Sequence, residues 1–259
     1  CHCKVDTGMC RTGVIYQVQE KNMDQILAEY RMEHLIVEGI FSHFPVSDDL
    51  GQGSAAFTKK QIELFEEVCD NLRKVGINPG IRHIQNSYGI LNYGDLKMDY
   101  CRPGLLYMGV TSDDAIPIAS KPDFIPILSW YANVSLVKWI QKGQSVSYGR
   151  HFIATKPTKV ATVSVGYADG LHRLVSNCGL EVLIHGQKCP IIGNVCMDQC
   201  MVDVTQVDDV KEGDVVVLVG RQGDHRVTID EISRKSHSIN NETLSDIAGR
   251  VPRLRRREK

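Results

Sequence analysis

Basic side chains stand in or just after apolar stretches of the first half of the chain. Lys4 and Arg11 lie seven residues apart in "KVDTGMCR", and His43 ends the apolar stretch "GIFSHF". Arg102, in "CRPGLLY", could hold an anion or a ring nitrogen. Each also has a plainer explanation: Lys4 and Arg11 as a surface pair beside a glycine turn, and His43 as a hydrogen-bonded core histidine.

Other residues have types that suit phosphate binding or proton transfer. Ser87 in "QNSYG" and the backbone at Gly104 could bind a phosphate, although Asn-Ser and Pro-Gly also form simple turns. Tyr148 in "SVSYGR" and Tyr167 in "SVGYADGLHR" each stand beside a glycine. A free tyrosine hydroxyl, with a pKa of about 10, becomes a useful base only if a His or Arg lowers that pKa. Both tyrosines could equally be packed aromatics.

The elements that would position these residues alternate in type up to about residue 115. In the longer helix, apolar residues recur every three or four positions, with Ser54 as N-cap and Gly76 as C-terminal stop. Alternation of strands and helices indicates parallel strands, and in a (β/α) barrel the active site lies at their carboxyl ends. The predicted helices are 21–35 and 54–76, and the predicted strands are 36–44 and 80–87, with 102–110 after a polar connection.

From about residue 126 the pattern changes to short β-rich runs separated by turn signals. This indicates a mostly antiparallel β domain, reached through the proline-containing linker 111–126. A last helix is predicted at about 228–248, before the basic tail 250–259. The predicted domains are 1–117 and 118–259, and the predicted strands of the second are 127–140, 159–167, 180–195, 200–205 and 214–220.

The first domain is too short for a complete barrel. Eight β/α units need about 200–250 residues, so roughly 115 residues hold about half of one. The predicted fold class is therefore α/β plus β: a partial (β/α)8 TIM-type barrel followed by an antiparallel domain. We expect the rest of the barrel to precede Cys1.

Composition gives the chain an ordinary globular character. It has 259 residues, 42% of them hydrophobic, and a net charge of −1, which gives no general reason to bind nucleic acid or anionic lipid. No apolar run approaches the roughly 18–20 residues of a membrane span, and no secretory signal is visible. The nine cysteines have scattered spacings with no C-x-x-C pair, so we expect reduced thiols, a cytoplasmic location and no metal site.

The order of the motifs is more specific than any motif alone. The chain resembles the alanine racemase family, which uses pyridoxal 5'-phosphate (PLP). The resemblance implies a PLP-binding barrel with a C-terminal β domain, a head-to-tail homodimer with shared active sites, and supply of D-alanine for peptidoglycan. The matching segments are "KVDTGMCR", "GIFSHF", "NSYG", "RPGLLYMG", "SVSYGR", "SVGYADGLHR", "GNVCMDQCMVDVT" and "GRVPR".

The resemblance also implies roles for individual residues. Tyr148 matches the base contributed by one subunit, opposite a lysine base of the other, and His43 and Arg102 match the network behind that Tyr. Arg102 also matches the arginine that faces the pyridine nitrogen of PLP in the family. Lys4 matches a lysine that is carbamylated in many members and that orients Arg11. The other implied contacts are Asn86, Ser87, Gly104 and Leu105 with the cofactor, Arg11 with cofactor and substrate, and Tyr167, Met197 and Asp198 with the substrate.

Three departures from the family pattern stand out. Cys10 replaces a usual glycine, and its β-carbon could shift the turn before Arg11. Gly249 stands where some members have a phosphate-binding tyrosine. The motif with the PLP-bearing lysine, similar to V-V-K-A-N-A-Y-G, does not occur in these 259 residues. We therefore expect this polypeptide alone to be inactive.

Several alternatives stay open. The substrate could be serine, or several amino acids, because one hydroxyl is a small discrimination. A related PLP decarboxylase would carry a Cys-Glu-Ser-Gly-Asp-like motif where this chain has "VCMDQCMVDV". A non-catalytic paralogue that binds a partner would explain the missing lysine. The basic tail 250–259 suggests nucleic-acid binding, but no aromatic stacking platform accompanies it. A membrane anchor would have to lie before Cys1.

Overall fold

The computed structural model describes residues 1–120 and 122–255. Lys121 of the predicted linker and the last four residues of the predicted basic tail lie outside the described residues. The chain divides into two compact units, Cys1–Ile125 and a second that begins at Pro126. We describe each unit by itself.

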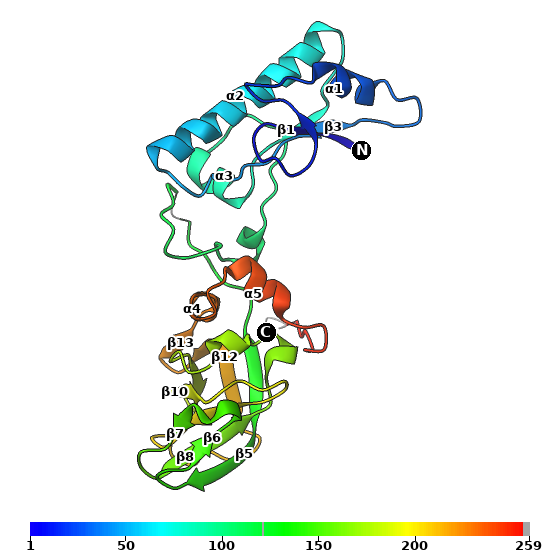
Figure 1. Ribbon diagram of the computed structural model, residues 1–259. Helices are drawn as coiled ribbons and strands as arrows, with labels where there is room; N and C mark the ends of the chain where they lie inside the picture. Colours follow the sequence, from blue (N-terminus) through cyan, green and yellow to red (C-terminus); the bar gives the residue numbers. More distant parts are fainter. Residues whose placement is uncertain (121, 256–259) are drawn as a thin grey trace. The chain divides into compact units, whose positions relative to one another are not determined.

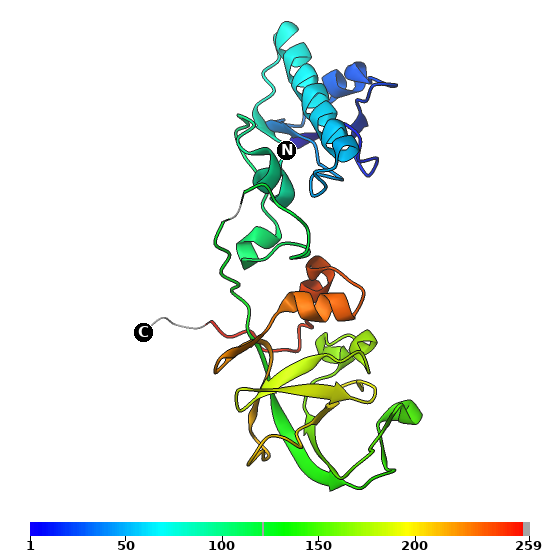
Figure 2. The same cartoon turned by 90° about the vertical axis from the view of Figure 1, so that its left-hand side faces the viewer.

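The first unit is built on a four-stranded parallel sheet with the order β2-β1-β3-β4. Its long helix α2 is drawn in cyan in Figures 1 and 2. A helix follows β2, β3 and β4 in turn, which confirms the predicted strand–helix alternation. Helix α2 packs on the sheet through a continuous buried cluster. The elements are β1 (His2–Asp6), β2 (Val14–Ile15), α1 (Met23–Tyr30), β3 (Gly39–Phe41), α2 (Gln52–Lys74), β4 (Ile81–His83), α3 (Ser87–Tyr93) and the 3-10 helix η1 (Leu105–Met108).

Helix α2 confirms the predicted apolar spacing but begins earlier than predicted. Phe65, Val68 and Leu72 are fully buried, as expected for one face of a helix. Ser54 is not the N-cap. Asp49 organises the start instead, since its carboxylate accepts the Gly51 N–H at 2.8 Å and the Ser54 hydroxyl at 2.6 Å. Gly76, with φ of +79°, follows the C-cap and ends the helix as predicted.

Other elements of this unit are shorter than the predictions, because only a few residues of each apolar run pair in the sheet. The helix predicted at 21–35 is limited to α1, and the strands predicted at 36–44 and 80–87 are limited to β3 and β4. Helix α3 was not predicted. Its start is set by Asn86, whose side-chain oxygen accepts the Gly89 N–H at 2.8 Å. The stretch 102–110 holds η1 and no strand.

The second unit is a closed antiparallel β structure. Strand β12 pairs with β5 on one side and with β9 on the other, so β5, β8, β11, β10, β9 and β12 form a ring, which β13 extends. This confirms the predicted antiparallel domain. The strands are β5 (Trp130–Ile140), β6 (Ser145–Val146), β7 (Phe152–Ile153), β8 (Thr158–Val163), β9 (Glu181–Ile184), β10 (Gln187–Ile192), β11 (Cys200–Asp203), β12 (Val215–Gln222) and β13 (His225–Val227).

The helix predicted at about 228–248 is two short helices, α4 (Ile229–Lys235) and α5 (Asn240–Asp246). The break comes where Ser236 turns its hydroxyl back to the carbonyl of Ile232 at 2.9 Å and His237 takes a φ of +55°. Short 3-10 helices connect the strands: η2 (Tyr148–Arg150), η3 (Tyr167–Asp169) and η4 (Arg173–Val175).

Two further features concern the described residues. None of the helices there is long and apolar enough to cross a membrane. The nine cysteines all lie in the described ranges, and all are free thiols.

Candidate active site

Neighbouring strands of the first unit place a cation, an aromatic ring and an imidazole in one row. Lys4 of β1 is in register with Phe41 of β3, and Phe41 is in register with His83 of β4. The Lys4 Nζ lies 5.3 Å from the centre of the Phe41 ring. The His83 ring stacks with the Phe41 ring, and the two ring centres are 5.1 Å apart. The Phe41 ring therefore lies between a polar group of β1, Lys4, and one of β4, His83.

Arg102 joins this row from the loop that precedes η1. Its backbone N–H donates to the Gln85 carbonyl at 2.9 Å, which holds the loop against the chain that leaves β4. Its guanidinium carbon lies 5.2 Å from the centre of the Phe41 ring. Nη1 donates to His83 Nδ1. Nη2 donates to the Ser42 carbonyl at 2.6 Å and to His43 Nδ1 at 3.2 Å. The cation is thus held by neutral acceptors and keeps its charge available.

Both imidazoles that accept from Arg102 are held neutral. Burial lowers the pKa of His43 to about 4, with further lowering by the charges of Arg102 and Arg11. Burial and the Arg102 charge likewise lower the pKa of His83 to about 4. A neutral imidazole can accept a hydrogen bond at its unprotonated nitrogen. A protonated imidazole carries an N–H on both nitrogens and could not accept from the guanidinium. The pKa values and the hydrogen bonds therefore agree.

The loop before Arg11 is organised by one buried carboxylate. Asp6 Oδ1 accepts the backbone N–H groups of Gly8, Met9 and Cys10 at 2.9–3.0 Å, and Oδ2 accepts that of Arg11 at 3.2 Å. Burial alone would raise the pKa of Asp6, but the N–H donors of Cys10, Gly8 and Met9, together with the charge of Lys4, outweigh it and the pKa is lowered. Asp6 was not among the residues predicted from the sequence, although an Asp before a Thr-Gly turn is a recognisable signal.

Cys10 takes up a glycine-like conformation within this loop. Its φ is +56°, in the left-handed region, and its N–H still donates to Asp6. The turn before Arg11 therefore forms with a β-carbon present, at the cost of backbone strain.

Lys4 lies half-buried between this loop and Phe41. Its Nζ donates to the Val5 carbonyl at 3.3 Å. Burial lowers the pKa of Lys4, the Asp6 carboxylate opposes that effect, and the Arg102 and Arg11 charges add to the lowering. Gly13 passes so close that a β-carbon there would lie 2.6 Å from the Lys4 carbonyl oxygen.

Candidate phosphate contacts lie where β4 gives way to α3. The Gly104 N–H donates to the Ser87 hydroxyl at 2.8 Å, so these two predicted residues lie together. A β-carbon at Gly104 would lie 3.5 Å from the Ser87 oxygen and would fill the space beside it. Asn86 serves as the α3 cap and donates to the Phe44 carbonyl at 3.2 Å. Leu105 begins η1 directly after Gly104.

In the second unit, Tyr148 stands on a strained turn. Three residues around it take left-handed backbone angles: Ser147 (φ +65°), Gly149 (φ +74°) and Arg150 (φ +53°). The neighbouring chain holds this turn, because the Ser147 hydroxyl donates to the Asn194 carbonyl at 2.6 Å and the Asn194 amide donates to the Tyr148 carbonyl at 2.9 Å. The Tyr148 side chain is 72% exposed. Strain of this kind collects at functional sites.

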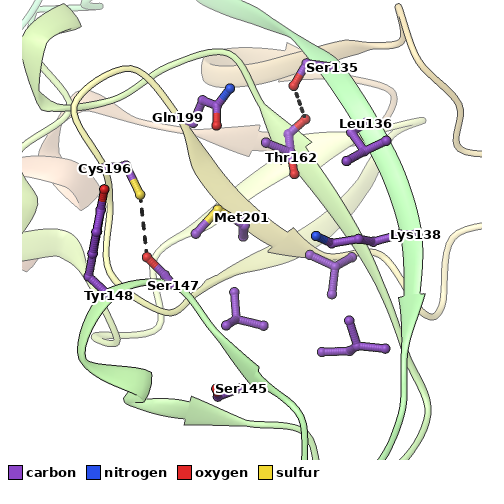
Figure 3. Close-up of a pocket in the computed structure, with 13 residues that line it drawn as sticks. Ser135, Leu136, Lys138, Ser145, Ser147, Tyr148, Thr162, Cys196, Gln199 and Met201 are labelled. Carbon is purple, nitrogen blue, oxygen red and sulfur yellow. Dashed lines mark hydrogen bonds between the residues drawn. The ribbon is translucent and has the colours of Figure 1, made fainter.

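Tyr148 borders a hollow of about 680 Å³ on the outside of the β ring (Figure 3). Cys196 also lines the hollow, with its sulfur 3.5 Å from the Ser147 hydroxyl, and Lys138 reaches toward the hollow from β5. Strands β5, β8 and β11 supply most of the remaining lining.

The other predicted substrate residues meet at a second turn of this unit. The N–H of Tyr167 donates to the Cys196 carbonyl at 3.0 Å, and the N–H of Ala168 donates to the Met197 carbonyl at 2.8 Å. This contact requires Gly166, because a β-carbon there would lie 2.3 Å from the Cys196 carbonyl oxygen. The structure thus joins the Tyr167 turn to the turn that carries Met197 and Asp198, which are both exposed.

The turn of Tyr167 is also tied to the C-terminal segment. The Asp169 carboxylate accepts the Gly166 N–H at 2.8 Å and the Arg250 Nε–H at 2.6 Å. Gly249 has open space around its α-carbon, so a side chain would fit there.

The structure therefore places the predicted residues in two groups. Lys4 and Arg102 lie over Phe41 in the first unit, His43 accepts from Arg102, and the charge of Arg11 acts on Lys4 and His43. Ser87 and Gly104 lie together after β4. The second unit carries Tyr148 at one turn and Tyr167, Met197 and Asp198 at another. Sequence reasoning missed His2, Phe41 and His83, because their contacts depend on the register between strands. Among the described residues, no group of three or more His, Cys, Asp or Glu could hold a metal ion.

Comparison with known proteins gives a consistent result. Residues 1–112 match the profile of the alanine racemase N-terminal domain, and residues 127–255 match that of the C-terminal domain. "Alanine racemase 2" of Caldanaerobacter subterraneus is 39% identical over 98% of this chain and 63% of the relative. The chain thus spans a little under two thirds of that relative's length.

Solved structures agree. The crystal structure of alanine racemase from E. faecalis has a TM-score of 0.85 at 30% identity, covering 97% of this chain and 64% of that one. That of alanine racemase from Bartonella henselae, described with covalently bound pyridoxal phosphate, has a TM-score of 0.79 at 28% identity and covers 98% and 65%. These likenesses confirm the predicted fold class of partial barrel and β domain.

Proposed function

Because the chain belongs to the alanine racemase family, we propose that it contributes to a PLP-dependent site that interconverts L- and D-alanine. One observation carries the proposal: the Arg102 guanidinium is held over Phe41 by neutral imidazole and carbonyl acceptors. A cation presented in this way suits an electron-rich ring atom or an anion. We infer a cytoplasmic enzyme that supplies D-alanine for peptidoglycan.

The first unit offers donors that fit the cofactor. Arg11, Lys4 and Arg102 make its surface around His43 positive, which suits a phosphate, a phenolic oxygen and a carboxylate. Ser87, Gly104 and the start of η1 at Leu105 would hold the phosphate, with Asn86 fixing the loop that carries them. Arg102 would meet the ring nitrogen. When bound, PLP would supply an electron sink for the charge that forms at the substrate α-carbon.

Tyr148 is proposed to take the α-proton of one enantiomer at its Oη atom, on one face of the α-carbon, while the lysine base that the resemblance implies delivers a proton on the opposite face; in the reverse direction the two exchange roles. Its exposure leaves that hydroxyl free to reach a substrate, and its backbone is fixed by Ser147 and Asn194. In the proposed dimer, His43 of the partner subunit would stand behind it as a neutral imidazole that accepts from Arg102. Arg11 and the Met197 backbone would hold the substrate carboxylate. Lys4 would be carbamylated and would orient Arg11; burial favours the neutral amine that this modification needs.

A head-to-tail homodimer would complete the site. Tyr148, Tyr167 and Met197 are 72%, 43% and 58% exposed in this chain. A base that works on a carbon acid needs a water-excluding surface around it. A second copy that presents the first unit to these turns would supply that surface.

The test compares the 259-residue chain alone with the same chain joined to a segment that carries the family's PLP-bearing lysine. We expect no turnover from the chain alone. With the lysine segment, we expect interconversion of alanine, with serine assayed beside it to detect broader specificity. Turnover from the chain alone would contradict the proposal that the lysine segment is needed for catalysis. Binding of PLP without turnover in either form would favour a non-catalytic paralogue.

Tyr148→Phe separates the proposed base from a packing role. Loss of a general base costs roughly 10²–10⁴-fold in rate. We expect this loss in α-hydrogen exchange from one enantiomer in D₂O. Tyr131→Phe, at a tyrosine 52% exposed on β5, is the matched control and should retain full activity. Equal rates for the two variants would rule out the role proposed for Tyr148.

A further inference from the structure

A further imidazole, that of His2, lies behind His83, one of the two histidines that accept from Arg102. His83 Nε2 is 2.7 Å from His2 Nδ1, and His83 Nδ1 accepts from Arg102. The two histidine rings are tilted at 54°, with centres 5.0 Å apart. His2, His83 and Arg102 thus form a continuous line of side chains from β1 through β4 to the loop before η1.

The chemistry of these groups gives the line a direction. A guanidinium has only donors, so His83 Nδ1 must be the acceptor in its contact with Arg102. A neutral imidazole has one N–H, which then resides on Nε2 and donates to His2 Nδ1. His2 therefore selects the tautomer of His83 that can hold Arg102.

A glycine in β3 leaves room for the His2 side chain in this line. Gly39 of β3 is in register with His2, and a β-carbon at Gly39 would lie 2.8 Å from His2 Nδ1 and 2.5 Å from the Ile81 carbonyl oxygen. Two residues further along β3, on the same face of the strand, Phe41 stacks on His83 at an interplanar angle of 7°. His83 itself is only 7% exposed. The rings of His2 and His83 are therefore packed into fixed positions.

We propose that His83 and His2 are positioning residues that hold the Arg102 guanidinium from behind and fix where this cation stands in the site. The hydrogen-bond line requires only the structure of the first unit. Its use, to place Arg102 against a cofactor ring, rests on the proposed function. His43 holds the other edge of the guanidinium through Nη2, so the two imidazole contacts clamp one side chain.

The first test measures tautomers in the chain as it exists, without cofactor. With ¹⁵N-labelled histidine, we expect His83 at pH 7 to give the signals of a neutral ring protonated at Nε2. The burial and charges that lower its pKa should keep it neutral well below pH 6. A ring protonated at Nδ1, or a doubly protonated ring, at pH 7 would overturn the proposal without any variant being made.

Variants then test the role of each imidazole. His2→Leu removes the acceptor, and loss of one hydrogen bond should shift the His83 tautomer ratio roughly fivefold. The matched control is His34→Leu at an exposed histidine, which should leave that ratio unchanged. Equal His83 spectra in the two variants would contradict the selection of tautomer by His2.

The hold on Arg102 has its own signature. Hindered rotation of the guanidinium gives distinct Nη signals, and these should persist in His83→Asn, whose amide oxygen can replace Nδ1 as acceptor. They should merge in His83→Leu. The same Nη signals in both variants would exclude His83 as the residue that holds Arg102. These readouts need no turnover, so failure of the racemase assay and failure of this inference are distinguishable.

Discussion

Acidification from pH 7 to pH 5 should destabilise the first unit, because two of its histidines resist protonation in the folded state. Burial and Arg102 lower the pKa of His43 and of His83 to about 4. In the unfolded chain each returns to about 6.5. Between these values the unfolded state binds more protons, so the free energy of unfolding falls as the pH falls through this window.

The magnitude follows from the two pKa values. At pH 5 an unfolded histidine is almost fully protonated, whereas a folded one with a pKa of about 4 is about one-tenth protonated. This difference corresponds to about 2 kcal/mol for each imidazole and about 4 kcal/mol for His43 and His83 together. A domain is commonly stable by only about 5–15 kcal/mol, so the effect is a large share of the total.

The assay must report on the first unit, and tryptophan fluorescence does not. Both tryptophans, Trp130 and Trp139, lie in β5 of the second unit. Amide hydrogen exchange of peptides from β3 and β4 is the suitable measurement. We expect their protection to fall between pH 7 and pH 5, after correction for intrinsic exchange rates. The tryptophan-detected unfolding transition should change less.

A variant pair identifies the source of the effect. His83→Asn removes one titrating imidazole and keeps an acceptor for Arg102, so the pH dependence of protection should fall by about half. His34→Asn, at an exposed histidine, should leave it unchanged. Equal protection at both pH values in the parent chain, or equal pH dependence in the two variants, would refute the reasoning.

Three further substitutions test local features. Cys10→Gly relieves the left-handed strain and should raise the free energy of unfolding by about 0.5–1 kcal/mol in urea titrations, and a lowered free energy would contradict the strain assigned to Cys10. Gly166→Ala should lower stability by about 2 kcal/mol or more and loosen the adjoining turns in hydrogen exchange, since its β-carbon would lie 2.3 Å from the Cys196 carbonyl oxygen; Gly249→Ala, in open space, is the neutral control. Thr228→Ala removes the N-cap of α4 and should lower stability by about 1 kcal/mol, and an unchanged urea midpoint would show that the cap contributes little.

Much of the fold could be predicted because local patterns carried it. The apolar spacing of α2 and the turn signals between the strands of the second unit both predicted elements that the structure contains. Boundaries were less accessible. The start of α2 depends on Asp49, which lies outside the helix, and the break between α4 and α5 depends on the Ser236 hydroxyl.

The residues of the candidate site could likewise be predicted only in part. Residues within a motif, such as Arg11 or Tyr148, could be singled out from their neighbours in sequence. His83 could not, because its value comes from stacking on Phe41 and bonding to His2, which are 42 and 81 residues away along the chain. Such contacts are set by the register between parallel strands, which the local pattern of either strand does not reveal.

The ring of strands in the second unit also sets an order for synthesis. Strand β5 can pair with β8 early, since Ile140 and Thr158 are close in sequence. Its other edge must wait for β12, where Val216 pairs with Ala132, 84 residues earlier. At about 5–20 residues per second, the ribosome leaves that edge open for roughly 4–17 s. We therefore expect closure by β12 to be the last step of β ring formation, and the interval before it to be when the nascent chain most needs a chaperone.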